Sequence, residues 1–343
     1  MYPEIDEPSF GSFVASLNRG LNEHTECEVD VLRRVDGARG LSSYVSMTAR
    51  GLRKGVTDRN YDLVHGHYIG VAAGVAWTMA QVLRAPLILT AHGSDVESAQ
   101  APATRFIQKQ LYAQCAGLHF VSEPLRLRAE SLLGRWSAPT LVAPTGVDLS
   151  HFSQEGKTER APGGRLRVMM VGQTVAHKGW EDGIQALALI RKEGLDVELL
   201  ALGGPRTQWL QGLAAKYGLS DALICKGEVP HHELAHYYRG ADAVLVASHR
   251  EGFGLVGLEA MACGAPVVST AVGGMQIYTE HNRNAWVVEV KNISGMAEGL
   301  SQVLGSPELR QRLAQGGLET VEAFSTKRSA LRLAEFYRQV LKA

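Results

Sequence analysis

The sequence predicts an α/β protein made of two doubly wound parallel-sheet domains, and three observations lead to this class. Short apolar runs alternate with helical patterns along nearly the whole chain, which is typical of strands covered by helices on both faces. The alternation stops once, between Ser150 and Arg165, in a polar segment punctuated by Gly and Pro. A chain of 343 residues is also longer than one ordinary core supports.

The first half of the chain carries four predicted strands, at residues 61–65, 86–90, 117–122 and 140–143. Helical patterns follow the first strand up to about Arg84, the second from near Thr104 to Ala116, and the third before the last strand. The chain opens on a turn-like stretch where such a domain normally begins with a buried strand. We therefore expect an N-terminal domain over residues 1–155 that lacks its first strand.

The second half repeats the alternation, with predicted strands at residues 166–171, 197–202, 223–225, 243–247 and 266–269. This pattern defines a second domain over residues 165–326. We expect the last helix, over residues 327–343, to pack back on the first domain. Ligands of open α/β sheets bind at the carboxyl ends of the strands, which predicts a ligand cleft between the two domains.

Charge, cysteine content and hydropathy exclude several functional classes. Lys and Arg total 35 and so do Asp and Glu, so the whole chain has no net positive charge to attract nucleic acid. The four cysteines are far apart, which favours free thiols in a reducing compartment. Neither a transmembrane run nor a signal peptide is present, and we expect a cytoplasmic protein.

Three short motifs suggest chemistry that their context argues against. Residues Gly252 to Gly257 spell G-x-G-x-x-G, but four residues separate them from the strand and no acid follows at the spacing that NAD requires. His232 to His236 spell H-E-x-x-H, a zinc-protease pattern, yet no third ligand follows at a usual spacing, so a surface helix is preferred. His65 and His67 share a strand face and could hold a metal, but hydrogen bonding to a substrate is the preferred interpretation. We therefore expect no bound metal.

Two glutamates eight positions apart, Glu251 and Glu259, flank the start of a predicted helix at about Gly254. A helix start presents free N–H groups and the positive end of its dipole, which suits phosphate. Glu251 in the loop can accept hydrogen bonds from a polyol, and Glu259 in the helix can accept them from two ribose hydroxyls. Carboxylates beside a diphosphate repel it unless they face hydroxyl groups, and a nucleotide-sugar satisfies these demands together.

The segment E-G-F-G-L-V-G-L-E-A-M-A-C-G-A-P-V-V resembles the E-x7-E signature of family 4 retaining glycosyltransferases, which have the two-domain GT-B fold. Four further segments resemble motifs of this family in the same order along nearly the whole chain. They are D-L-V-H-G-H at 62–67, T-A-H-G-S-D at 90–95, P-T-G-V-D at 144–148 and V-G-Q-T-V-A-H-K-G at 171–179.

The resemblance implies a role for each matching residue. Lys178 would neutralise the departing diphosphate, Glu251 would hold the donor sugar, and Glu259 the ribose. His92 would lie near the reacting centre on the acceptor side. The remaining donor contacts would come from Phe253, Gly254, Leu255, Gly11 and Gln173. The family implies a cofactor-free, metal-independent hexosyltransferase that uses a UDP-sugar or GDP-mannose and retains the anomeric configuration.

Three positions depart from the family pattern. Gln173 replaces an arginine, Ile277 stands where the family has an acid, and Ala285 replaces a glycine. These departures leave open two alternatives: another nucleotide-sugar enzyme, such as an epimerase or a sucrose-type synthase, and a weakly active nucleotide-sugar-binding subunit.

The acceptor is expected to be a saccharide or a lipid-linked saccharide of bacterial cell-surface polysaccharide or glycolipid assembly, because the opening of the chain resembles such enzymes. A basic stretch could meet anionic lipid at the inner membrane face, and a solvated basic face is an equal alternative. Its members are Arg33, Arg34, Arg39, Arg50, Arg53, Lys54 and Arg59.

Overall fold

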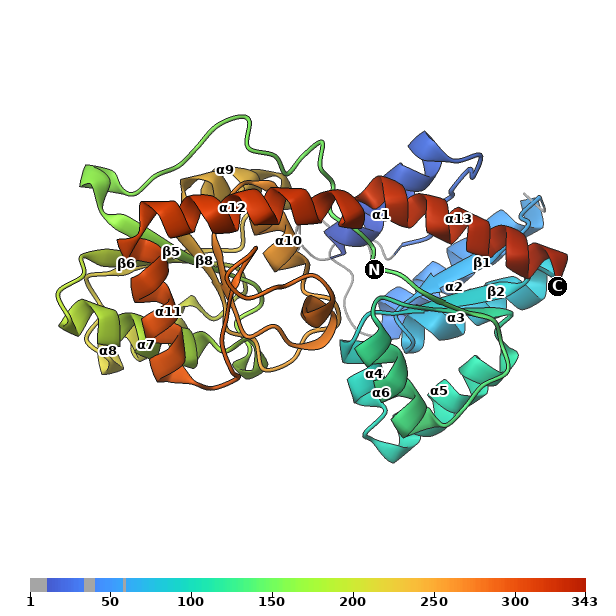
Figure 1. Cartoon of the computed structure of the whole chain (residues 1–343). Coiled ribbons are helices and arrows are strands. Elements are labelled where there is room, and N and C mark those ends of the chain that lie inside the picture. Colours follow the sequence, from blue (N-terminus) through green and yellow to red (C-terminus); the bar gives the residue numbers. More distant parts are fainter. Residues whose placement is uncertain (1–10, 34–40, 58–59) are drawn as a thin grey trace. The chain divides into compact units, whose positions relative to one another are not determined.

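The computed structural model describes residues 11–33, 41–57 and 60–343, and these residues form two compact units (Figure 1). Unit 1 combines the chain up to Gly146 with Thr326–Ala343, and unit 2 is the continuous segment Val147–Ser325. Each unit is an α/β domain with a fully parallel sheet, which confirms the predicted fold class. The opening stretch with the predicted missing strand, together with Arg34, Arg39 and Arg59, lies outside the described residues.

The sheet of unit 1 has four strands in the order β1-β2-β3-β4. They are β1 (Val64–His67), β2 (Leu87–Ala91), β3 (Gly117–Phe120) and β4 (Thr140–Val142). β2 and β3 are buried along their whole length, as expected for apolar runs covered on both faces. β1 begins three residues later than predicted and extends to His67, so both of its histidines belong to the strand.

Two helices of unit 1 precede β1, and the next four fill the connections between the strands. They are α1 (Ser12–His24), α2 (Leu41–Thr57), α3 (Val71–Leu83), α4 (Ser94–Ser98), α5 (Pro102–Gln114) and α6 (Glu123–Leu133). α6 has a side-chain cap, because Ser122 Oγ accepts from Leu125 N at 3.3 Å, and Pro124 stands at its first turn. In the basic stretch, Lys54 pairs with Asp30 at 2.8 Å, and Arg50 donates to the backbone carbonyl of Arg33.

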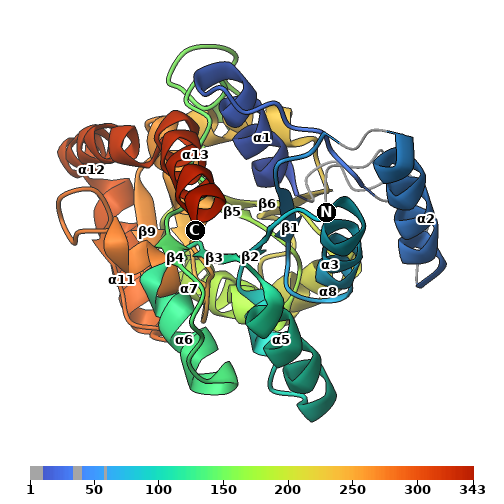
Figure 2. The ribbon, with the colours of Figure 1, turned by 90° about the vertical axis from the view of Figure 1, so that its right-hand side faces the viewer.

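The last helix, α13 (Thr326–Lys342), belongs to unit 1 and lies alongside α1, as Figures 1 and 2 show. Two glycines let it approach closely. A Cβ at Gly20 would come within 2.9 Å of Thr326, and a Cβ at Gly117 would come within 2.9 Å of the Phe336 ring. The apolar face of α13, which includes Leu333 and Phe336, is thereby buried over the start of β3.

The sheet of unit 2 has six strands in the order β10-β9-β8-β5-β6-β7. They are β5 (Leu166–Val171), β6 (Val197–Leu202), β7 (Leu223–Gly227), β8 (Ala243–Val246), β9 (Val267–Ser269) and β10 (Trp286–Val287). β5 pairs with β6 on one side and with β8 on the other. The strand order therefore reverses at β5 and β8, and ligands of doubly wound sheets bind beyond the carboxyl ends of such a pair.

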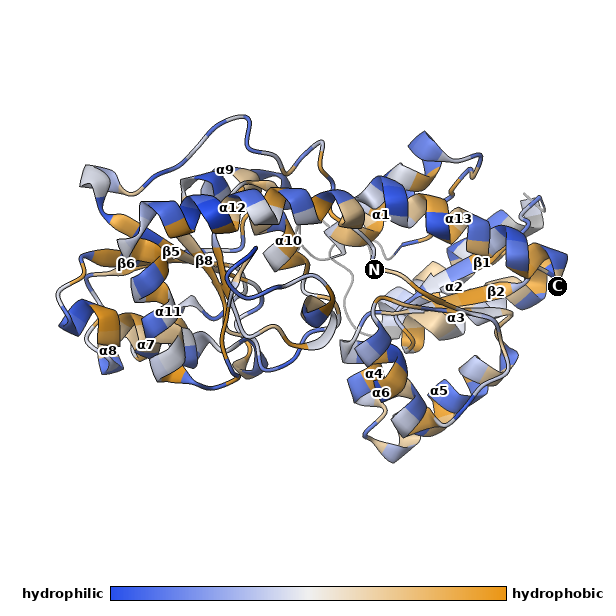
Figure 3. Ribbon diagram, in the orientation of Figure 1, coloured by the Kyte–Doolittle hydropathy of each residue, from blue (hydrophilic) through white to orange (hydrophobic). Residues whose placement is uncertain are grey.

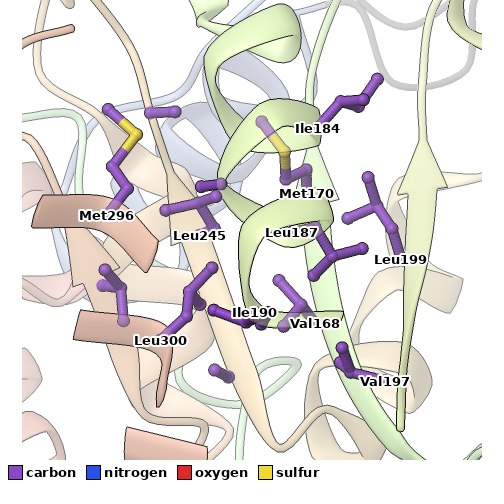
Figure 4. Packing of buried hydrophobic residues seen from close by; sticks show 14 of the residues in the cluster. Val168, Met170, Ile184, Leu187, Ile190, Val197, Leu199, Leu245, Met296 and Leu300 are labelled. Atoms are coloured by element: carbon purple, nitrogen blue, oxygen red, sulfur yellow. The ribbon is translucent and has the colours of Figure 1, made fainter. Parts of the chain in front are cut away.

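Six α-helices complete the described part of unit 2, namely α7 (Trp180–Lys192), α8 (Thr207–Lys216), α9 (Leu234–Gly240), α10 (Leu255–Ala262), α11 (Ile293–Gly305) and α12 (Pro307–Val321). One face of the sheet packs against α7 and α11 in an apolar core that includes Val168, Leu187 and Leu300 (Figure 4). Burial of this kind contributes about 25 cal/mol per Å2 of apolar surface. This core holds β5 and β8 rigidly beneath the loops that follow them.

The polar segment that follows Ser150 is attached to unit 2 by arginine side chains that donate to its backbone carbonyls. Arg239 donates to the carbonyls of Lys157 and Ser153 at 2.8 and 2.9 Å, and Arg167 donates to the carbonyl of Glu159 at 2.8 Å. The segment that the sequence predicts as a linker thus belongs to the second compact unit, whose first residue is Val147.

Hydropathy follows the layers of each unit. In Figure 3 the strands are coloured mainly as hydrophobic, whereas the helices carry mixed faces. Over the residues that the structure describes, no helix combines the length and the apolarity needed to cross a membrane. The four cysteines are unpaired with one another, and burial raises the pKa of the Cys115 and Cys263 thiols to about 12.

Candidate functional site

The two loops that follow β5 and β8 meet at the point where the strand order reverses. The first loop leads through the 3-10 turn η2 (Ala176–Lys178) into α7. Gly179, which caps α7, has φ 69°, and a Cβ there would lie 2.0 Å from the carbonyl oxygen of Ala247. The amide of His249 donates to the carbonyl of His177 at 2.7 Å. Only glycine permits this approach, and the approach brings the residues after β5 beside those after β8.

Lys178 and Glu251 form an ion pair at this junction. Lys178 Nζ lies 2.7 Å from Glu251 Oε1 and 2.9 Å from Oε2, and Ser248 Oγ donates to Oε1 at 2.7 Å. The side chains are 22% and 11% exposed, so the pair is largely but not fully removed from water. Lys178 and Glu251 are 73 residues apart in the chain, and the structure brings these two predicted site residues into direct contact.

A second side-chain contact fastens the same loop to α7. His249 Nε2 lies 2.6 Å from Asp182 Oδ2, and both side chains are mostly buried. Burial and the neighbouring positive charge of Lys178 lower the pKa of His177, which keeps that ring neutral beside the ion pair. The position of Glu251 is thus fixed from both sides, by Ser248 within the loop and by the contact of His249 with α7.

The start of α10 is held by the turn η4 (Gly273–Ile277). Gly254, the residue before α10, has φ 86°. A Cβ at Gly254 would lie 2.3 Å from Met275, and a Cβ at Gly257 would lie 2.6 Å from the hydroxyl of Tyr278. A Cβ at Gly273 would lie 2.0 Å from the carbonyl oxygen of Glu251. Glycine at 254 and 257 is therefore required by close packing within unit 2.

The predicted donor contacts Phe253 and Leu255 lie on either side of Gly254. The Phe253 side chain is buried and packs against Tyr278 and Phe324, so only its backbone could meet a ligand. The first amides of α10 have no acceptor within the helix, as at any helix start, which leaves donors for an anion. Gln173 is exposed in the loop after β5, where its carbonyl accepts from Trp180 Nε1 at 2.9 Å.

Glu259 lies in α10 with both carboxylate oxygens engaged. Tyr238 donates to Oε2 at 2.9 Å, and His231 Nε2 lies 2.9 Å from Oε1. Burial, with the charge of Glu259 second, raises the pKa of Tyr238 well above its usual value, so this hydroxyl remains a donor. Neither partner was identified from the sequence, because they lie 21 and 28 residues away from Glu259 and belong to no motif of the loop.

The two histidines of the H-E-x-x-H pattern lie in different elements. His232 lies in the 3-10 turn η3 (His231–Glu233), whereas His236 lies in α9, which begins at Leu234. The His232 side chain is 73% exposed and approaches only Glu233, at 4.0 Å. Among the residues that the structure describes, no group of three His, Cys, Asp or Glu side chains could hold a metal ion.

The remaining predicted site residues, Gly11 and His92, belong to unit 1. Gly11 precedes α1 with φ 76°, a conformation that favours glycine. His92 follows β2, and its ring contacts the rings of Phe13 at 5.0 Å and Tyr68 at 4.5 Å between centroids. The buried Asp95 carboxylate accepts from the amides of His92 and Gly93 at 3.1 and 2.8 Å. Asp95 therefore fixes the backbone that carries His92, which explains the acid at the end of the T-A-H-G-S-D segment.

A chain of hydrogen bonds crosses the sheet behind His92. His119 Nε2 lies 2.8 Å from the carbonyl of Ala143, and since a carbonyl can only accept, this nitrogen carries the proton. Its Nδ1 therefore accepts from Thr90 Oγ1 at 2.9 Å, and Thr90 in turn accepts from His65 Nε2 at 2.6 Å. His65 Nδ1 then accepts from the hydroxyl of Tyr337, on α13, at 2.6 Å.

Burial keeps these histidines neutral. It lowers the pKa of His65 to about 3 and that of His119 to about 4, and it places the pKa values of His67 and His92 well below the usual value. His67 Nδ1 and His92 Nε2 are 3.0 Å apart, so one neutral ring donates to the other. His65 stacks on His67 with centroids 4.4 Å apart, and the hydrogen bonds given above join both rings to other side chains of unit 1.

The comparisons with known proteins match both units. The family description "Glycosyl transferase 4-like domain" matches residues 14–146, and "Glycosyl transferases group 1" matches residues 153–320. A D-inositol 3-phosphate glycosyltransferase of Actinosynnema mirum is 33% identical over 82% of this chain and 73% of its own length. The chain belongs to the group 1 glycosyltransferase family. A second relative of the same name, from Frankia alni, is 30% identical over 82% of this chain and 75% of its own length.

Solved structures support the GT-B fold of this group 1 glycosyltransferase. The sucrose-phosphate synthase of Thermosynechococcus elongatus has a TM-score of 0.79 at 22% identity and covers 96% of this chain and 93% of its own. HepE of Anabaena, in complex with UDP and glucose, has a TM-score of 0.73 at 19% identity, with coverage of 92% and 87%. At this level of identity the likeness concerns the fold alone.

Proposed function

We propose that this glycosyltransferase moves a sugar from a nucleotide-diphospho-sugar to a hydroxyl acceptor, with retention of configuration and without a bound metal. The observation that supports this most is the Lys178–Glu251 ion pair at the point where the strand order reverses, 2.7 Å between Nζ and Oε1, next to the free start of α10. A cation, free amides and a carboxylate together suit a diphosphate that carries a polyol.

The proposed roles follow from this placement. Lys178 neutralises charge on the leaving diphosphate, which lowers the barrier mainly by electrostatic stabilisation and positioning. The amides of Phe253, Gly254 and Leu255 receive phosphate or sugar oxygens, Glu251 accepts from the hydroxyls of the donor sugar, and Glu259 accepts from the ribose. In unit 1, His92 and Gly11 belong to the acceptor side and the diphosphate side, respectively.

The donor is a UDP-sugar or GDP-mannose. HepE binds UDP and glucose in its solved complex, and this favours a uridine nucleotide as the first to be tested. Gln173, which lacks the charge of the arginine that the family pattern has there, reduces the positive charge beside the phosphates. The alternative of a weakly active nucleotide-sugar-binding subunit rests on this departure. The other alternative, an epimerase or a sucrose-type synthase, would be distinguished by the product that it forms.

Two acceptor classes are proposed. The named activity of the relatives is glycosylation of D-inositol 3-phosphate, which favours a phosphorylated cyclitol. A saccharide or lipid-linked saccharide of surface polysaccharide assembly, with a peripheral contact at the inner face of the membrane, is the second class. Incubation of one labelled donor with inositol phosphates and with lipid-linked saccharides separates the two classes by the product formed.

Calorimetric titration with UDP-glucose, UDP-N-acetylglucosamine and GDP-mannose, with and without EDTA, tests the proposed function. We expect one donor to bind with an affinity that EDTA does not change, and slow donor hydrolysis that Glu251→Ala and Lys178→Ala abolish. Binding of none of the donors, or binding that EDTA removes, would refute the proposal. Hydrolysis that persists unchanged in both variants would place the reaction elsewhere, and NMR of the transferred product reports whether the configuration is retained.

A further inference from the structure

The second glutamate of the site is held by two donors that lie outside the segments quoted above for their resemblance to the family. Tyr238 and His231 each bind one oxygen of the Glu259 carboxylate, at 2.9 Å in both cases. Tyr238 is fully buried, so it holds Oε2 from the interior of unit 2. The His231 side chain is 20% exposed, so it holds Oε1 from the side that solvent reaches.

One aromatic ring packs against both donors. Phe152 is 1% exposed and lies edge-on to both rings, with its centroid 5.0 Å from that of His231 and 6.0 Å from that of Tyr238. The His151 ring stacks on that of His231 with centroids 6.3 Å apart. The Nε2 atom of His151 is buried without a hydrogen-bond partner in the described residues. The imidazole of His231 is therefore seated in a small aromatic cluster, and its orientation toward Glu259 is fixed by packing.

Two fixed donors determine which lone pairs of the carboxylate remain for a ligand. A carboxylate offers about four acceptor sites. With one site on each oxygen occupied, the rest of the carboxylate can accept two further donors, which matches the two adjacent hydroxyls of a ribose. Because both oxygens are already oriented, a ribose does not have to order this side chain when it binds, and such preorganisation favours affinity.

We propose that His231 is a ribose-positioning residue: it orients the Glu259 carboxylate so that this group receives the 2′- and 3′-hydroxyls of the donor nucleotide. The inference rests on the proposed role of Glu259 in nucleotide binding. His231 acts through Glu259, so its contribution depends on the presence of the ribose hydroxyls. It does not depend on the sugar of the donor or on the acceptor.

The test measures how strongly the full chain prefers a ribonucleotide over its 2′-deoxy form. Affinities for UDP and 2′-deoxy-UDP, and for GDP and 2′-deoxy-GDP, are measured calorimetrically for the unmodified protein and for His231→Ala. The ratio of two affinities measured on one preparation is independent of the fraction of folded protein. His231→Gln, whose amide nitrogen can replace Nε2, is the rescue variant, and His232→Ala is the matched control because this side chain is 73% exposed and lies outside the cluster.

We expect the unmodified protein to prefer the ribonucleotide about tenfold, the contribution of one hydrogen bond to a charged group. In His231→Ala this preference falls to about twofold, in His231→Gln most of it returns, and in His232→Ala it is unchanged. Equal weakening of both nucleotides in His231→Ala would show a merely structural role. Tighter ribonucleotide binding in that variant would show that His231 occupies the place of the ribose, and either result overturns the inference. Failure of the unmodified protein to bind any nucleotide would refute the proposed function itself.

Discussion

Replacement of Glu251 by Gln should strengthen the binding of free UDP while it weakens catalysis. In the unliganded protein the Glu251 carboxylate neutralises Lys178, with 2.7 and 2.9 Å between Nζ and the two oxygens. A diphosphate that approaches Lys178 must compete with this carboxylate for the ammonium group. The amide of Gln keeps the shape of the side chain and removes the charge, so the competition is lost.

The magnitude follows from the distance and the exposure of the pair. Two unit charges about 3 Å apart attract by about 1.4 kcal/mol at the dielectric constant of water and by about 5.5 kcal/mol at an effective value near 20. Because the two side chains are only 22% and 11% exposed, the attraction exceeds the value at the dielectric constant of water, which therefore gives the minimum gain. A gain of about 1.4 kcal/mol corresponds to about tenfold tighter UDP binding.

Calorimetric titration with UDP, together with the rate of donor hydrolysis, measures both effects. Lys178→Ala should bind UDP about tenfold more weakly, and the substitution at Glu251 should have little effect on UDP binding in a Lys178→Ala background. Glu280→Gln removes an exposed partner of Arg283 and is the matched control. A fall in UDP affinity in Glu251→Gln would refute the electrostatic reasoning. An equal rise on this substitution in the unmodified protein and in Lys178→Ala would refute it as well.

Three further predictions concern stability. Glu198→Leu leaves the buried Arg167 guanidinium without its partner at 2.6 Å and should lower the free energy of unfolding, measured in urea, by about 3–5 kcal/mol. A second change, Arg167→Met, should restore most of this loss. No recovery in the double variant would contradict the prediction. Gly179→Ala, at φ 69°, should lower the melting temperature measurably. Gly212→Ala adds a methyl group that meets open space in α8, and it should leave the melting temperature unchanged or raise it. Equal shifts of the melting temperature in both variants would contradict this prediction. His119, with its pKa lowered to about 4, binds a proton more readily in the unfolded chain, so its contribution to the free energy of unfolding is full above pH 6.5 and falls toward pH 4 by up to about 1.4 kcal/mol per pH unit. His119→Asn should reduce this slope, measured by urea unfolding at pH 7.5 and 5. The same slope in the variant would refute the assignment.

The strands could be predicted from the sequence wherever they are continuous and apolar. The predicted bounds of β5 and β6 agree with the structure at both ends, because both runs are apolar except for Arg167 and Glu198, which pair with each other. β10 has only Trp286 and Val287, too short for any periodicity, and was not predicted. α1, α2 and α4 were also not predicted.

The candidate site could be predicted only as far as its motifs extend. Lys178, Glu251 and Glu259 belong to recognisable segments, and the structure places the first two in contact. The partners that orient Glu259 could not be predicted, because they come from η3 and α9, where the sequence pattern drew attention to His232 rather than to the adjacent His231. Packing constraints such as that of Met275 on Gly254 are likewise invisible until the chain is folded.

The first and last residues of unit 2 are neighbours. Val147 pairs with Ser325 in a parallel bridge, and its amide donates to the carbonyl of Phe324 at 2.9 Å. In topological terms the segment 147–325 is an insertion whose two covalent connections emerge side by side. A short peptide could therefore join residue 146 to residue 326 directly, and the excised segment, which keeps its own six-stranded sheet and core, is suited to expression as an independent fragment.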